Sequence, residues 1–306
     1  MDMTQHMSTS SAIRIAELVS ELVSIVSFTA SVSTPPPKFS SELRWRHSDE
    51  HKDITLFVLT KLMGATSTVH ACVQLAASGH WFQVLVLARS VNEALLQIEW
   101  VFESFKAKRH ISNEASKFSE EIAEHFKDFW SDADRPFDET RSRKTITIRQ
   151  LSAVGGRQQS SESTITQHDA LEGVFQAMRV QSDFVHTAYP TVMELFSEHG
   201  WVLAVKQPAP QMFDELHVAW LLRNCVQSAH KVCDFLVCCM RAAVGIAERL
   251  GDMNDGTSVL NAQIQCLLSK SGKLTNLLAL IDTEFPSSGE ERTFLKQSKA
   301  VAPNKG

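Results

Sequence analysis

The sequence predicts an all-α protein, a multi-helix bundle, on three observations. Apolar residues recur at spacings of three and four in the long segments, which is the pattern of a helix with one buried face. Twelve glycines, nine prolines and a single tyrosine argue against a turn-rich β protein. Hydrophobic residues make up 43% of the 306 residues and charged residues 21%, which is enough apolar surface for one large or two modest domains.

The first expected element is an amphipathic helix over about residues 12–30, followed by a proline-rich linker. Its expected inner side carries Ile13, Ile15, Leu18, Leu22 and Val23. Glu17 and Glu21 interrupt the segment, which makes it a poor signal peptide. No run in the chain reaches the ~18 apolar residues of a membrane helix. We therefore expect a separate N-terminal unit over residues 1–37, a cytoplasmic location and no membrane partner.

The next two elements form an antiparallel helical hairpin. The first helix spans about residues 48–78, from Ser48 or Asp49 as its cap to Gly79 as its stop. The second is VLVLARSVNEALLQIEWVFESF, Val84 to Phe105, and it follows almost at once. A connection this short places the two helices side by side in opposite directions.

The middle of the chain is expected to hold shorter elements. Apolar spacing predicts helices over about residues 111–131, 148–154 and 169–186. Residues 199–207 alternate between apolar and polar side chains, which predicts a small β-hairpin, the one strand candidate in the sequence.

The longest helix is expected over about residues 210–250, with a last helix over about 258–281. The core stripe of the long helix consists of Leu222, Cys225, Val226, Ala229, Cys233, Leu236 and Met240. We expect residues 38–282 to form the bundle domain and residues 283–306 a loosely held tail.

Charge, cysteines and motifs exclude several classes of protein. A net charge of −5 leaves no global basic field for nucleic acid. None of the six cysteines forms a C-x-x-C pair and four fall on the helix over 210–250, which favours small core residues in a reducing cytosol. His47 and His51 have a metal-ligand spacing without a visible third ligand, and no phosphate loop or dinucleotide motif is present. We expect no metal and no cofactor.

Three sets of polar residues are candidates for a site. Arg89 and Glu93 lie four residues apart on a strongly apolar helix, so they must pair if they are buried. Such a pair either fixes helix packing or presents Arg89 to an anion, with Glu93 orienting it.

The second set lies on the helix over 169–186. Arg179 and His186 are two turns apart and share a side of this helix, with Ser182 between them. His186 either caps the end of the helix or acts as a general base or phosphate contact beside Ser182.

The third set is Arg223, Asn224 and His230 on the longest helix. Arg223 and His230 are seven residues apart, so they lie above one another on one face, and Asp234 is placed to orient the imidazole. The alternative is a solvated helix flank without a chemical role.

Two resemblances follow from these residues. Ala88 to Glu93 (ARSVNE) and Ser182 to His186 (SDFVH) resemble the R-S-x-x-E and S-x-x-x-H motifs of uncharacterised bacterial all-helical proteins. This resemblance covers about residues 50–245. It implies a helical fold and a bacterial cytosolic setting, without an established activity.

The second resemblance concerns Arg223, Asn224 and His230, which are similar to the R-x4–6-H motif of HEPN domains. Those domains are helical and usually dimeric, and many are metal-independent ribonucleases in toxin–antitoxin and phage-defence systems. The resemblance implies that Arg223 would polarise the scissile phosphate and His230 would act in proton transfer, with Asn224 positioning these two residues. A homodimer and RNA are the partners that it implies.

Three functions follow as expectations. The first is a cytosolic bacterial helical protein with a buried polar binding site of Arg89, Glu93, Ser182 and His186, serving stress or phage defence. The second is a HEPN-like ribonuclease with Arg223, Asn224 and His230 as catalytic residues. The third is a structural or scaffold helical protein, in which these polar residues only hold the core together.

Overall fold

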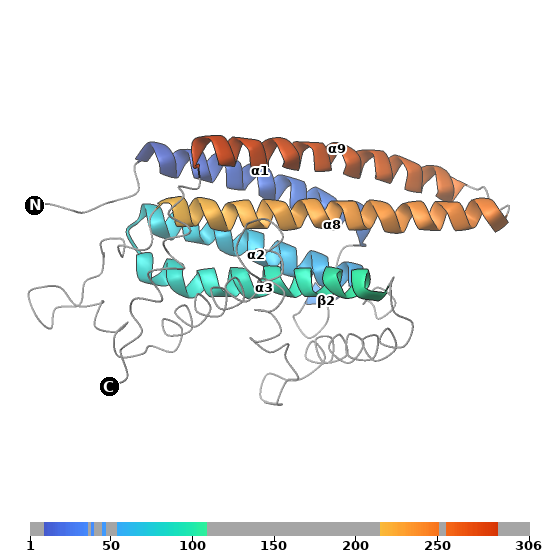
Figure 1. Ribbon diagram of the computed structural model, residues 1–306, viewed down its shortest axis with the longest axis horizontal. Coiled ribbons are helices and arrows are strands. Elements are labelled where there is room, and N and C mark those ends of the chain that lie inside the picture. Colours follow the sequence, from blue (N-terminus) through green and yellow to red (C-terminus); the bar gives the residue numbers. More distant parts are fainter. Residues whose placement is uncertain are drawn as a thin grey trace, which may run out of the picture.

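The computed structural model describes residues 9–35, 38–39, 45–46, 54–108, 215–250 and 255–286 (Figure 1). The helices of this part are α1 (Thr9–Ser33), α2 (Ile54–Ala77), α3 (Trp81–Lys108), α8 (Glu215–Leu250) and α9 (Asp255–Glu284). Two short strands, β1 (Lys38–Phe39) and β2 (Trp45–Arg46), pair antiparallel. The predicted all-α helical bundle is confirmed.

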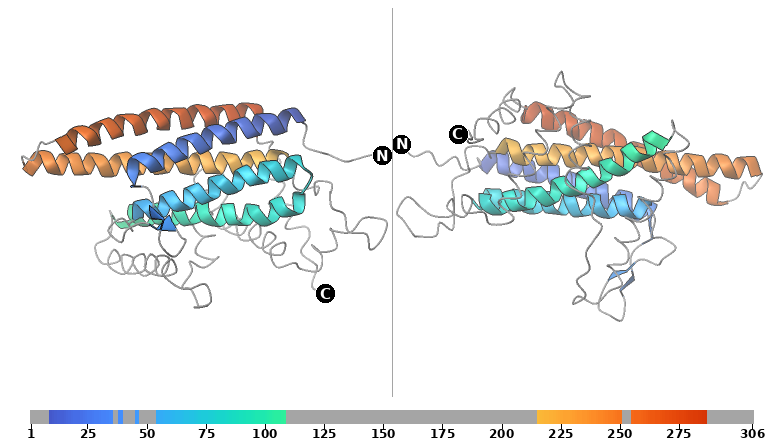
Figure 2. Two further views of the ribbon diagram at one scale, coloured as in Figure 1. Left: turned by 180° about the vertical axis from the view of Figure 1, so that it is seen from behind. Right: turned by 60° about the horizontal axis from the view of Figure 1, so that its bottom comes forward.

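The bundle is built from two helical hairpins and α1. α2 and α3 form one hairpin, and Gly79 in the turn between them has φ of 80°, a left-handed conformation that favours glycine. α8 and α9 form the other hairpin, and α1 packs against α2, α8 and α9 (Figure 2). Gly79 as the stop of α2 is therefore confirmed.

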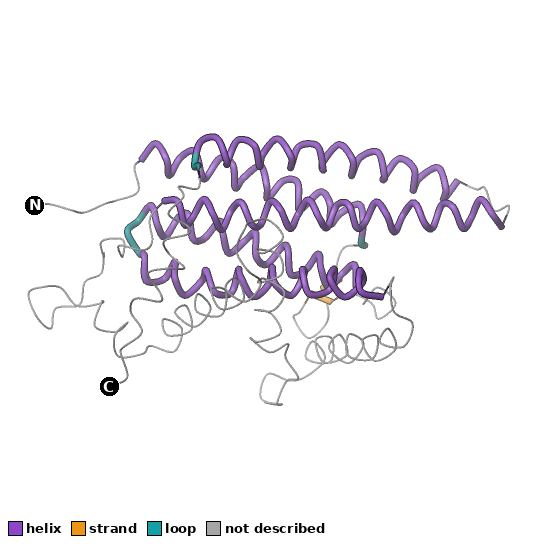
Figure 3. Tube along the Cα trace, viewed as in Figure 1, coloured by secondary structure: helices purple, strands orange, loops and turns teal. Residues whose placement is uncertain are grey.

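The α8–α9 hairpin is longer than the rest of the bundle. α8 has 36 residues and α9 has 30. Their connected ends project past the ends of α1, α2 and α3, as Figures 1 and 2 both show. The tube in Figure 3 shows that both helices remain continuous through the projecting part. One end of the hairpin is thus packed in the bundle, whereas the other is a two-helix projection.

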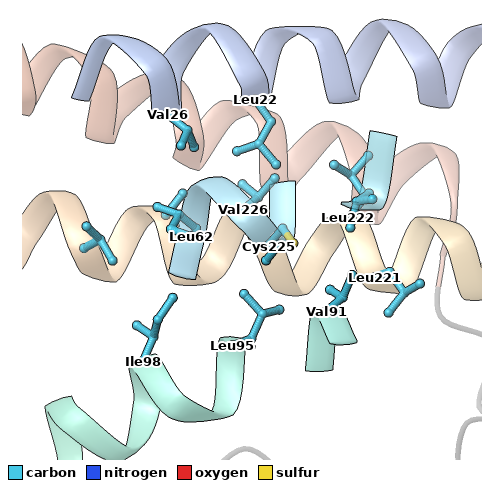
Figure 4. Close-up of a cluster of buried hydrophobic side chains, with 14 of the residues drawn as sticks. Leu22, Val26, Leu62, Val91, Leu95, Ile98, Leu221, Leu222, Cys225 and Val226 are labelled. Atoms are coloured by element: carbon cyan, nitrogen blue, oxygen red, sulfur yellow. The ribbon is translucent and has the colours of Figure 1, made fainter. Parts of the chain in front are cut away.

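The core lies where α1, α2, α3 and α8 meet (Figure 4). Its buried side chains include Leu22, Val26, Leu62, Val91, Leu95, Ile98, Leu222, Cys225 and Val226. The predicted stripe of α8 is confirmed as core, and only Met240, at its distal end, is partly exposed.

α1 belongs to the same core. Ile15, Leu18 and Leu22 are buried as predicted. Ile13 was wrongly expected on the inner side and is exposed, because the buried row of α1 runs through residues 15, 18, 19, 22, 25 and 26, which leaves position 13 on the outer side. The expected boundary at residue 37, between an N-terminal unit and the bundle domain, therefore falls between helices that share one hydrophobic core.

Among the described helices, two are long and apolar enough to cross a membrane, judged by length and composition alone. They cover Ser10–Ser33 and Ile54–Ala77. The core helices of soluble proteins pass the same test, and both of these helices bury side chains in the bundle. The expected absence of a membrane partner and the cytoplasmic location stay predictions.

Several predicted elements lie outside the described residues. These are the helices over 111–131, 148–154 and 169–186, and the hairpin over 199–207. The last helix extends from Asp255 to Glu284, somewhat longer at both ends than the predicted 258–281.

Candidate functional site

Arg89 and Glu93 form the predicted ion pair on α3. One Nη atom of Arg89 lies 2.6 Å from Oε1 of Glu93, and the two side chains are 12% and 34% exposed. Leu85 and Trp100, which share a face of α3 with this pair, are buried. The arginine is therefore held inside the helical packing by a carboxylate that reaches toward solvent. Ser182 and His186 lie outside the described residues, so their meeting with Arg89 stays a prediction.

Arg223 points across the hairpin to α9. Its Nε donates a hydrogen bond to Oδ1 of Asp282 at 2.7 Å. Asn224, the next residue, is partly buried. A carboxylate therefore already pairs with the arginine that the HEPN resemblance assigns to a phosphate.

His230 belongs to a three-residue polar cluster between α8 and α9. Nδ1 of His230 lies 3.2 Å from Oδ2 of Asp234, which confirms that Asp234 lies beside the imidazole. Nε2 lies 3.2 Å from Oγ of Ser271, and Ser271 Oγ donates to Oδ1 of Asp234 at 3.1 Å. Ser271 was missed by sequence reasoning because it comes 41 residues after His230.

The cluster has the residue types of a hydrolytic triad but not its working arrangement. Ser271 is buried, and its hydroxyl donates to Asp234 instead of to the imidazole. A nucleophilic serine needs an open approach and a base that accepts its proton. The cluster therefore acts as a polar tie between α8 and α9.

Two further ion pairs tie α8 and α9 to the rest of the bundle. Lys231 of α8 donates to Glu99 of α3 at 2.8 Å, and the Glu99 side chain is only 8% exposed. Arg14 of α1 binds both carboxylate oxygens of Glu284 of α9 at 2.7 Å. Hydrogen bonds from Arg14 hold the pKa of the Glu284 carboxyl below its usual range.

These contacts give the polar residues one common feature. Arg14, Arg89, Arg223 and Lys231 each meet a carboxylate, and three of the four pairs join two different helices. A cation already paired in this way offers little to a substrate phosphate unless the pair opens. The ion pairs of the described helices therefore favour a structural role.

The cysteines divide into two groups. Cys72, Cys225 and Cys233 are buried, as expected for core residues, and burial raises the pKa of the Cys72 thiol to about 12. Cys238, Cys239 and Cys266 are exposed, so the expectation that the four cysteines of the long helix are core residues was wrong for Cys238 and Cys239. In the described helices no group of three His, Cys, Asp or Glu side chains is placed to hold a metal ion.

The apolar stripe of α8 continues onto the projecting part of the hairpin. We define the α8 seam as nine residues whose spacing alternates between three and four: Leu222, Cys225, Ala229, Val232, Leu236, Cys239, Ala243, Ile246 and Leu250. The first five are buried in the bundle and the last four are exposed. Ile246 is 57% exposed and Leu250 is 77% exposed.

α9 carries a matching exposed set of Val259, Ala262 and Cys266. The pairs Arg223–Asp282 and Asp234–Ser271 fix the antiparallel register, which places Ile246 level with Val259. In each helix the exposed set lies about a third of a turn around the helix axis from the residues that face the other helix. Viewed from the N-terminus of each helix, this rotation has the same direction in both. Because the helices are antiparallel, both sets fall on one side of the hairpin.

We call this side the hairpin face. It consists of Cys239, Ala243, Ile246, Leu250, Val259, Ala262 and Cys266. None of these seven residues is charged, and the partly buried Gln263 lies between the α8 and α9 sets. A comparison with protein-family models, curated proteins and solved structures finds no match for this chain.

Proposed function

We propose that this chain is a non-catalytic scaffold protein that binds a partner helix on the hairpin face. The observation that carries the proposal is the α8 seam, whose regular spacing continues without a break from the buried core into solvent. An apolar seam with this spacing is the surface onto which a second helix packs in a coiled coil. Of the three functions expected from the sequence, this proposal is the scaffold function. It adds the hairpin face as the surface that binds a partner.

The hydrophobic free energy of burial favours a partner that covers the hairpin face. Burying a Val, Leu or Ile side chain contributes roughly 1.5–3 kcal/mol, and the projecting tip exposes Ile246, Leu250 and Val259 together. Contiguous exposed apolar surface of this kind marks interaction sites in soluble proteins. A binding surface also needs rigid support. The ion pairs at the base of the hairpin supply it, because they hold α8 and α9 in one orientation.

Site-specific photo-crosslinking tests the proposal. A benzoylphenylalanine replaces Ile246 in the full-length chain, which is expressed in its own cells and irradiated. The matched control carries the same group at Glu248, an exposed position on the opposite side of α8. We expect covalent adducts from position 246 and none from position 248. Absence of any adduct from position 246 overturns the proposal.

A HEPN-like ribonuclease is the second candidate, and one observation favours it. Arg223 and His230 both point toward α9 from one side of α8, and each side chain is about a third exposed. Purified protein would then cleave single-stranded RNA in EDTA, and His230→Ala would lose at least ~100-fold in rate. Equal digestion by both proteins identifies a contaminant, and no digestion by either rejects this activity.

A further inference from the structure

We infer that the partner helix on the hairpin face is α8 of a second copy of this chain, packed antiparallel to the first. The inference rests on the proposed docking function and names its partner. Three features of the projecting hairpin support it: the order of side-chain sizes along the seam, the charges beside it and the position of the bundle.

The side chains of the exposed seam follow an order of small and large residues that is complementary to the same order read in the opposite direction. In an antiparallel pair whose centre lies between residues 244 and 245, Ile246 lies opposite Ala243 of the second copy, and Leu250 lies opposite Cys239 of the second copy. Each large side chain therefore meets a small one in all four layers. A parallel pair would put Ile246 against Ile246 and Ala243 against Ala243, which alternates crowded and empty layers.

Charges beside the seam are compatible with the same register. The flanking positions Met240, Ala242 and Ala247 are uncharged, and Arg249 falls near Ala242 of the second copy. Arg241, like Glu248, lies on the far side of α8. Between the two α8 helices, no like charges therefore oppose one another. Opposed like charges are the usual electrostatic barrier to self-association.

The position of the bundle sets the length of the overlap. α1, α2 and α3 pack on the proximal part of α8, and the seam becomes exposed at Cys239 (Figure 2). In the antiparallel register Leu250 of the second copy lies level with Cys239 of the first, at the edge of the bundle. The two bundles then lie at opposite ends of the dimer, whereas a parallel pair would bring them against each other.

The size of the face sets the expected strength. Seven residues of each chain form the face, fewer than the roughly 20–30 residues a side of a standard interface. We therefore expect a dimer that forms with a dissociation constant above ~1 µM and dissociates on dilution. Such pairing would be controlled by the local concentration of the chain.

Sedimentation equilibrium of the full-length protein tests the pairing. We expect the mean mass to rise from monomer toward dimer between about 1 µM and several hundred µM. Ile246→Lys should keep the protein monomeric throughout. Glu248→Lys, which introduces the same side chain on the opposite side of α8, should dimerise like the wild type. A monomeric wild type, or loss of dimer in both variants, overturns the inference.

Disulfide trapping tests the register. In Leu250→Cys, mild oxidation with diamide should link the introduced cysteine to the native Cys239 of the second copy, and peptide mass spectrometry identifies the product. A link between the two introduced cysteines alone shows parallel pairing and overturns the antiparallel register. The photo-crosslinks separate the two proposals: adducts with a different protein, beside a monomeric wild type, leave docking standing and remove self-pairing.

Discussion

Removal of Lys231 should destabilise the bundle strongly, because this lysine supplies the positive charge for a buried carboxylate. Lys231 Nζ lies 2.8 Å from Oε2 of Glu99, and Glu99 is 8% exposed while Lys231 is 37% exposed. Lys231→Met keeps the aliphatic stem that covers the contact and removes only the charge. The carboxylate then stays in a largely dry position without its ammonium partner.

The magnitude follows from the burial of the two groups. Breaking a fully buried pair by removing one partner costs about 3–5 kcal/mol. The lysine end of this pair is open to water, which can reach the carboxylate in the variant, so we expect about 3 kcal/mol for Lys231→Met. Glu99→Leu combined with Lys231→Met removes both charges and should recover to within ~1 kcal/mol of the wild type, since an apolar pair needs no counterion.

Guanidinium unfolding followed by circular dichroism measures both effects. The free energy of unfolding of the four proteins (wild type, the two single variants and the double variant) forms a double-mutant cycle. A loss below ~0.5 kcal/mol in Lys231→Met would place the pair among weak surface contacts and refute the reasoning. A double variant that is less stable than Lys231→Met would show that packing, and not charge, accounts for the loss.

Three further outcomes follow from the described contacts. Glu93→Ala should lower the free energy of unfolding by about 1–3 kcal/mol, less than for a fully buried pair because Glu93 is itself a third exposed, and an unchanged melting temperature would show that Arg89 does not depend on it. Thr66 Oγ1 is buried without a hydrogen-bond partner among the described residues, so Thr66→Val should raise stability by ~1 kcal/mol in the same assay, and a loss would contradict this. Burial raises the pKa of the thiols of Cys72 and Cys225 in the folded state, so these thiols ionise first in the unfolded chain, above about pH 8.5. The contribution of the two buried thiols to stability is complete below that pH and is lost as the pH rises further. Melting temperatures recorded across this alkaline range should fall less steeply in Cys72→Ala, and equal slopes would exclude the effect.

The helices with strong local signals could be predicted from the sequence. The stripe of α8 extends over many turns, so its helix and its buried face were both correct. Gly79 was recognisable as a stop because a left-handed residue at a helix end favours glycine. Arg89 and Glu93 pair within one turn of one helix, so their contact also follows from local geometry.

Contacts between distant parts of the chain could not be predicted. Ser271 meets His230 across the hairpin, and Glu99 meets Lys231 across 132 residues. These pairs depend on the register and packing of helices, which periodicity does not specify. A single sequence contains no local mark that selects one distant partner from many.

The exposure of the distal part of the α8 seam is the most informative difference between the sequence-based expectation and the structure. Cys225 and Cys239 occupy equivalent positions in one regular stripe, yet the first is buried and the second is exposed. Spacing shows which side of a helix is apolar, but the neighbouring helices decide where that side is covered. The expectation of core cysteines was therefore correct inside the bundle and wrong on the projection.

Labelling of two adjacent cysteines in cells tests most directly whether a helix covers the hairpin face. Cys238 and Cys239 are both exposed in the single chain, but only Cys239 lies on the face, and the buried Cys233 serves as an internal reference. Maleimide labelling, resolved by tandem mass spectrometry, should modify Cys239 more slowly relative to Cys238 in cells than in dilute purified protein. Ile246→Lys should remove that difference. An equal ratio of labelling in cells and in dilute protein would show that the face stays open, and would contradict the docking function.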